Sequence, residues 1–156
     1  MSKFYTGVGS RSTPSHIMKV MGLLAVKLSI DGWTLRSGGA VGADSAFEHG
    51  VTIVGGSKEI YLASDANKAA LEMASAIHPA WYKCSDYVRK LHARNCFQVL
   101  GRDLRTPSSF LVCWTLAGAN VGGTRTAIVL ARNHNIEVIN LGFAEQLNRI
   151  TQYIQQ

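Results

Sequence analysis

The chain alternates short, mostly apolar runs with longer stretches in which apolar residues recur every three to four positions. Runs of the first kind predict strands and stretches of the second kind predict helices, because side chains repeat every 2 and every 3.6 residues in these structures. The predicted strands are 3–8, 33–36, 58–63, 109–115 and 137–141. The predicted helices are 14–31, 43–54, most of 66–101, 124–135 and 143–154.

This alternation predicts an α/β fold, a Rossmann-like doubly wound parallel sheet of about five strands with helices on both faces. The run 109–115 is almost continuously apolar, which is typical of a central strand covered on both sides. The long helical insertion 66–101 separates the third strand from the fourth, and it suits a reversal of strand order there. Ligands of such sheets bind beyond the carboxyl ends of the strands, near the point of reversal.

Composition narrows the class of protein. The chain has 156 residues, of which 47% are hydrophobic and 17% charged, so it is too apolar for disorder and suits one domain over 1–156. Its N-terminus lacks the pattern of a signal peptide, and no apolar run reaches the roughly 18 residues of a membrane span. We therefore expect a cytoplasmic protein with no membrane partner.

Cysteine and histidine give no sign of a metal centre in the sequence. The three cysteines match neither a disulfide framework nor a zinc-ligand spacing; they are Cys84, Cys96 and Cys113. The histidines also lack metal-ligand spacing; they are His16, His49, His78, His92 and His134. We expect reduced, mostly buried thiols, no metal ion and no cofactor.

Glycine clusters follow the first, second and fourth predicted strands, and all three therefore fall on the same edge of the sheet. They are Gly7 and Gly9, then Gly38, Gly39 and Gly42, then Gly118, Gly122 and Gly123. Each cluster leads into a helix N-terminus, whose free N–H groups and partial positive charge suit a phosphate. The pattern favours an anionic, nucleotide-like ligand over tight turns without a ligand. Neither the G-x-G-x-x-G fingerprint nor the ATPase-type phosphate loop is present.

Four blocks of the sequence resemble the motif series of the SLOG superfamily, in order and spacing over about residues 4–141. They are Gly9-Ser10-Arg11, Ser37-Gly38-Gly39-Ala40-Val41-Gly42-Ala43-Asp44, Arg94-Asn95 and Gly122-Gly123-Thr124-Arg125-Thr126-Ala127. The blocks look closest to the DNA-processing protein A (Smf) family and the small YspA-like proteins of phages and prophages. They are more distantly similar to the Lonely Guy phosphoribohydrolases.

The resemblance implies a Rossmann-like fold that binds a nucleotide, a nucleotide-derived signal or single-stranded DNA. It implies phosphate contacts at Ser10, Arg11, Gly38, Gly39, Gly122, Gly123 and Thr124. The further ligand contacts expected at the same blocks are Gly9, Ser37, Asp44, Arg94 and Asn95.

Asp44 and Glu48 are the candidate catalytic residues. They are four positions apart and so share a helix face beside the second glycine turn. One carboxylate could orient a ribose hydroxyl, while the other could stabilise an oxocarbenium-like centre or activate water during cleavage of an N-glycosidic bond. The alternative is that Asp44 caps the helix and Glu48 is solvated.

A basic segment supplies most of the excess charge. The stretch Lys83–Arg105 holds six Lys and Arg against two Asp, a net +4 out of +6 for the chain. Arg94 shares a helix face with Tyr87, Lys90 and Gln98. Aromatic residues in this segment and just before it could stack bases, or they could belong to the core; they are Trp81, Tyr82, Tyr87 and Phe97. The same alternative applies to Trp114, which ends the fourth predicted strand.

Three functions fit these residues. The first is binding of a nucleotide or nucleotide-derived molecule, with hydrolysis of its N-glycosidic bond as an open question. The second is a non-catalytic sensor or sequestering protein for an ADP-ribose-type or cyclic signalling nucleotide in phage defence or counter-defence. The third is binding of single-stranded DNA. Related folds often pair through a helix face, so a homo-oligomer is also expected.

Overall fold

The computed structural model describes residues 3–120 and 122–156. Its strands form one parallel five-stranded sheet in the order β3-β2-β1-β4-β5. The strands are β1 (Phe4–Gly7), β2 (Thr34–Gly38), β3 (Lys58–Tyr61), β4 (Phe110–Cys113) and β5 (Glu137–Asn140). The predicted α/β class is confirmed, and every predicted strand overlaps an observed one.

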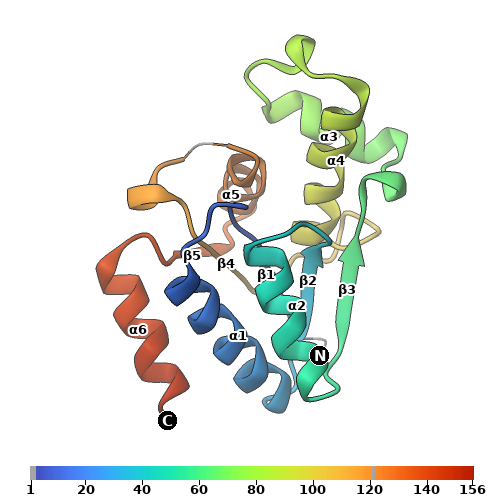
Figure 1. Ribbon diagram of the computed structural model, residues 1–156. Helices are drawn as coiled ribbons and strands as arrows, with labels where there is room; N and C mark the ends of the chain where they lie inside the picture. Colours follow the sequence, from blue (N-terminus) through green and yellow to red (C-terminus); the bar gives the residue numbers. More distant parts are fainter. Residues whose placement is uncertain (1–2, 121) are drawn as a thin grey trace.

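Helices cover both faces of the sheet (Figure 1). One face carries α1 (Ser15–Ile30), α2 (Ala43–Ile53) and α6 (Ala144–Ile154). The other carries α3 (Lys68–Ile77), α4 (Asp86–Leu100) and α5 (Thr124–Asn133). Within residues 3–120 and 122–156, no helix combines the length and the apolar character needed to cross a membrane.

The central strand β4 explains why its sequence is almost continuously apolar. Leu111 and Cys113 pack in the core beneath α4 and α5, whereas Val112 packs in the core beneath α1 and α2. Alternate side chains of a strand point to opposite faces. Because both faces are covered by helices, both sets of side chains are buried, as the sequence predicted.

The strand order reverses at β1. The chain proceeds outward through β2 and β3, and it returns to the other side of β1 as β4. The insertion between β3 and β4 contains η1 (Ala63–Asp65), α3, η2 (Trp81–Lys83) and α4. The reversal predicted from the length of this insertion is confirmed, and it leaves a crevice between the carboxyl ends of β1 and β4.

Helix α4 is fixed above β1 and β2 by polar contacts at its C-terminal end. The Thr6 hydroxyl donates to the Gln98 carbonyl oxygen at 2.5 Å and lies 2.8 Å from Ser108 Oγ. Arg36 is 2% exposed, forms an ion pair with Glu59 at 3.2 Å and donates to the Thr106 carbonyl oxygen. The Thr6 contact joins the end of α4 to β1, and the Arg36 contacts join the segment after α4 to β2 and β3.

Candidate functional site

A crevice of about 1030 Å³ opens at the carboxyl ends of β1 and β4. This volume lies at the upper end of the range usual for small-molecule sites. Its walls are the turns that follow both strands, the N-terminus of α5, the first turn of α2 and one face of α4. Most predicted ligand residues line it, namely Gly9, Ser10, Arg11, Asp44, Arg94, Asn95, Trp114, Gly122, Gly123 and Thr124.

The turn after β1 is held rigidly by its own hydrogen bonds. The Ser10 carbonyl oxygen accepts from the Thr13 backbone N–H at 3.2 Å and from the Thr13 hydroxyl at 2.5 Å. The second glycine turn packs against it, since a Cβ at Gly42 would lie 2.8 Å from Arg11 Cα. Gly42 also has a φ of +90°, which favours glycine. The packed turns leave the Arg11 side chain exposed at the rim of the crevice.

The N-terminus of α5 borders the crevice at Gly122, Gly123 and Thr124, and none of the described side chains caps it. Gly123 immediately precedes the helix and has the ordinary helical angles φ −64° and ψ −30°. A Cβ added at Gly123 would meet no atom of the described residues within 4 Å. Neither backbone conformation nor packing therefore requires glycine at this position. The small residue leaves the backbone at the start of α5 open to close approach.

Asp44 and Arg94 converge at the end of β2. A Cβ at Gly38 would lie 2.7 Å from both Asp44 Oδ2 and Arg94 Nη1, so glycine there makes room for both side chains. Asp44 is 4% exposed, and burial raises its pKa from 3.8 to about 6, although the charges of Arg94 and Arg11 act in the opposite direction. Among the described residues that line the crevice, Asp44 alone carries a carboxylate. This carboxyl group can therefore exchange a proton near neutral pH.

The second candidate carboxylate does not reach the crevice. Glu48 accepts a hydrogen bond from Lys58 Nζ at 2.7 Å and does not line the cavity. The spacing of four correctly places Asp44 and Glu48 near one another along α2, but only the first turn of that helix borders the crevice. The structure therefore does not assemble the predicted pair. The alternative role of Asp44 as the helix cap is also not observed, because the N-cap is Gly42 without a side-chain bond.

Three other predicted ligand residues, Ser37, Gly38 and Gly39, do not line the crevice. Ser37 is buried and donates its hydroxyl hydrogen to the Gly7 carbonyl oxygen at 2.5 Å. Gly38 provides space for Asp44 and Arg94, as described above. A Cβ at Gly39 would lie 2.8 Å from Leu62 Cδ2. These residues shape the site from outside the cavity lining.

The aromatic candidates separate into core and surface residues. Phe97 is a core residue, 1% exposed. Trp114 is 9% exposed and packs in the core beneath α1 and α2, and it also borders the crevice. Tyr87 lines the crevice and is 61% exposed. Tyr87 on α4 therefore offers an exposed aromatic ring at the crevice, where a base could stack.

Sequence reasoning did not assign a ligand role to Gln98, which lines the crevice four residues after Arg94. The signal was present in the helical spacing, because Tyr87, Arg94 and Gln98 share one face of α4. Lys90 belongs to the same predicted face, but it borders a different hollow. The other residues that line the crevice are Val8, Ser12, Pro14, Ala40, Val88, Leu91, His92, Thr115, Leu116 and Ala127.

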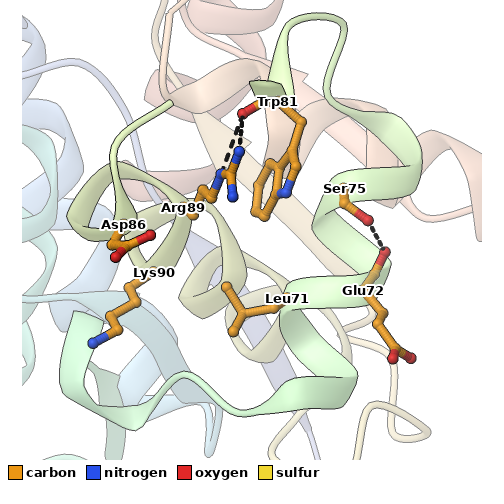
Figure 2. Close-up of a pocket in the computed structure, with 7 residues that line it drawn as sticks. All are labelled: Leu71, Glu72, Ser75, Trp81, Asp86, Arg89 and Lys90. Carbon is orange, nitrogen blue, oxygen red and sulfur yellow. Dashed lines mark hydrogen bonds between the residues drawn. The ribbon is translucent and has the colours of Figure 1, made fainter. Parts of the chain in front are cut away.

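That second hollow, of about 270 Å³, lies between α3, η2 and α4 (Figure 2). Arg89 donates two hydrogen bonds to the Trp81 carbonyl oxygen, and its guanidinium lies 5.3 Å from the centroid of the Trp81 ring. Elsewhere, Arg102 lies 3.8 Å from the Asp65 carboxylate. The basic residues of 83–105 are therefore distributed among separate sites, with Arg94 at the crevice.

The fold also assembles a group that the sequence spacing did not predict. His78, Cys84 and His92 place their potential metal-ligand atoms within 4.8 Å of one another, which corrects the expectation that the histidines and cysteines form no such group. They converge because η2 turns the chain back against α4. However, the Ala80 N–H donates to His78 Nδ1 at 3.0 Å, which assigns the ring proton to Nε2. That protonated nitrogen lies 3.8 Å from Cys84 Sγ, so the group is arranged as a hydrogen-bonded pair of Cys and His.

His92 joins this group to the wall of the crevice. Its Nδ1 lies 2.8 Å from the Thr126 hydroxyl at the start of α5. Burial, followed by the charges of His78 and Arg94, lowers the pKa of His92 to about 4. His92 is therefore neutral at pH 7 and supplies a hydrogen-bonding ring without charge.

The crevice thus brings together cationic side chains, the N-terminus of α5 and one buried acid at the switch point of the sheet. Comparison of the chain with family models, curated proteins and solved structures gives no match in any of the three.

Proposed function

We propose that the protein binds a phosphorylated nucleoside or a nucleotide-derived molecule in the crevice between β1 and β4. The observation that carries this proposal is the open N-terminus of α5 at Gly123, which borders the same cavity as Arg11 and Arg94. Backbone N–H groups at a helix N-terminus and two guanidinium groups favour a phosphate. The resemblance of the glycine blocks to the SLOG superfamily supports the same ligand class.

Hydrolysis of the bond between base and ribose is the reaction proposed for this site. In that reaction the C1′–N bond breaks, water supplies the new C1′–O bond, and the departing base takes a proton. Asp44 is the proposed acid or base, because its pKa of about 6 makes both protonation states available. A protein that binds the same nucleotide without turnover, as a sensor or sequestering protein, is the second candidate, because Glu48 does not join Asp44 in the crevice.

The distribution of basic residues favours a small ligand over single-stranded DNA. An extended polyanion needs a continuous positive groove. Here Arg94 borders the crevice, Arg89 and Lys90 border the second hollow, and Arg102 lies beside Asp65. A weak dependence of ligand affinity on salt would accompany a small ligand, whereas DNA binding would give a steep one.

The substitution Gly123→Val is expected to weaken binding of nucleoside 5′-phosphates by at least tenfold. A valine side chain fits the helical backbone angles at this position, but it would occupy the open space in front of the α5 N–H groups. Calorimetry with adenosine 5′-monophosphate, guanosine 5′-monophosphate and ADP-ribose measures the change. Loss of one charge-assisted hydrogen bond, about 1.5–3 kcal/mol, accounts for a tenfold or larger effect.

Ala69→Val is the matched control, since Ala69 is an exposed residue of α3 and does not line the crevice. Its affinity should equal that of the wild type. Equal affinities of the wild type and Gly123→Val would contradict the placement of phosphate at α5. Absence of binding by the wild type to every compound of the panel would overturn the proposed function.

A further inference from the structure

Gln98 carries a side-chain amide without a hydrogen-bond partner in the described protein. The residue is 1% exposed, and neither the nitrogen nor the oxygen of its amide is paired. Its backbone carbonyl oxygen, in contrast, accepts hydrogen bonds from the Thr6 and Ser108 hydroxyls. Folded proteins pair nearly all buried polar atoms, so this amide indicates a partner that the protein itself does not supply.

One helical turn before Gln98, the Arg94 side chain carries a further polar atom that no described residue pairs. Its Nε is buried and makes no hydrogen bond. Residues four apart lie on the same face of a helix, and both Arg94 and Gln98 line the crevice. Together the unpaired groups offer N–H donors from the amide and from Nε, and one acceptor, the amide oxygen. Their partner should therefore present both acceptors and a donor.

The buried residues that line the crevice include polar ones, such as Asp44 and Thr115 at 4% and 3% exposure, and apolar ones. Val8 and Ala127 are 5% and 1% exposed, and both border the cavity with Gln98. These four residues, Val8, Arg94, Gln98 and Ala127, define what we call the inner end of the crevice. A flat group with apolar faces and a polar edge suits the combination of these apolar side chains with the Gln98 amide and Arg94 Nε.

We propose that the inner end of the crevice binds the edge of a nucleobase through the Gln98 amide and Arg94 Nε. Glutamine pairs with the adjacent donor and acceptor of adenine, and arginine pairs with the acceptors of guanine. Hydrogen bonds to the base give partners to the unpaired Gln98 amide and to Arg94 Nε. This inference rests on the proposed function, because it assigns the base of the same ligand whose phosphate meets the N-terminus of α5.

Gln98→Met tests the assignment, because methionine has a similar volume and no hydrogen-bonding edge. We expect its affinity for the adenosine or guanosine 5′-monophosphate that the wild type binds to fall by about tenfold to a hundredfold. Affinity for ribose 5-phosphate, which lacks a base, should stay within about twofold of the wild type. The melting temperature should be equal or higher, since methionine leaves no unpaired amide.

Two further variants complete the experiment. Gln98→Leu repeats the test with a different apolar shape, in case methionine disturbs the packing. Gln152→Met is the control at an exposed position of α6 and should leave every affinity unchanged. An equal loss for ribose 5-phosphate and for the nucleotides would assign Gln98 to the sugar and overturn the inference, as would no loss for either. Failure of the wild type to bind ribose 5-phosphate and all nucleotides would instead overturn the proposed function, and this inference with it.

Discussion

Asp44→Asn is expected to make the protein more stable at pH 7 while lowering the rate of base release by about 10²- to 10⁴-fold. The lower rate follows because asparagine cannot transfer a proton, and general acid–base catalysis contributes a factor of this size. The higher stability follows because a buried carboxylate is costly. The rise of its pKa from 3.8 to about 6 means that the charged Asp44 lowers the free energy of unfolding by on the order of 1–3 kcal/mol. Chromatographic assay of free base and thermal melting measure the two effects.

The pH dependence gives the sign of the stability effect. Between pH 4 and 6, folded Asp44 holds its proton while the unfolded group has released it, so the free energy of unfolding of the wild type decreases as the pH rises. Above pH 6 the full penalty is present, and the asparagine variant lacks it. The stability difference between the two proteins should therefore be largest at pH 7 and above, and it should narrow as the pH falls from 6 to 4.

Asp86→Asn is the control, because Asp86 is exposed at the start of α4 and does not line the crevice. It should change neither the rate nor the pH dependence. A wild type that binds nucleotide and releases no base would support the sensor or sequestering function in place of hydrolysis. A stability difference that does not change between pH 4 and 7 would contradict the raised pKa of Asp44.

Gly50→Ala is expected to lower the free energy of unfolding by about 3 kcal/mol and the melting temperature by roughly 10 °C. Helices α1 and α2 cross here with little space between them. A Cβ at Gly50 would overlap the Gly22 carbonyl oxygen and lie 2.9 Å from Ala25 Cβ. The better helix propensity of alanine, about 1 kcal/mol, does not offset a clash with backbone. Thermal and urea denaturation would measure the loss.

Gly22→Ala is the matched control from the same crossing. Its Cβ would lie 3.6 Å from the Ala46 carbonyl oxygen, an ordinary contact, and Gly22 is inside α1. This variant should be as stable as the wild type or more stable, by up to about 1 kcal/mol. A Gly50→Ala protein that is no less stable than Gly22→Ala would show that the helices separate without cost.

The fold was predictable because each element carries its own local signal. The apolar run 109–115 predicted the buried strand β4, and the length of the insertion predicted the reversal of strand order, which fixes the position of the crevice. Glycine clusters after three strands marked the correct edge of the sheet. These features depend on residues close in sequence, and the topology rules for parallel sheets then limit how the elements assemble.

The parts of the site that the sequence missed depend on contacts between distant residues. Whether Glu48 meets a ligand or Lys58 depends on where β3 lies beside α2, and helical spacing does not contain that information. The group of His78, Cys84 and His92 forms only when η2 folds back against α4. Gln98 was placed on the correct face of α4, but its lack of a hydrogen-bond partner is visible only when its surroundings are known.

The crevice is built partly by loops and partly by one helix, and this arrangement affects how its ligand specificity could change among relatives. Apart from Arg94, the groups proposed to hold the phosphate come from turns built into the sheet edge, where substitutions such as those at Gly42 would disturb packing. The groups proposed to meet the base lie on a single face of α4. Relatives that share these turns could therefore acquire new ligands by changes at Tyr87, Leu91 and Gln98 alone. A library restricted to these three positions would be the economical route to retarget the protein.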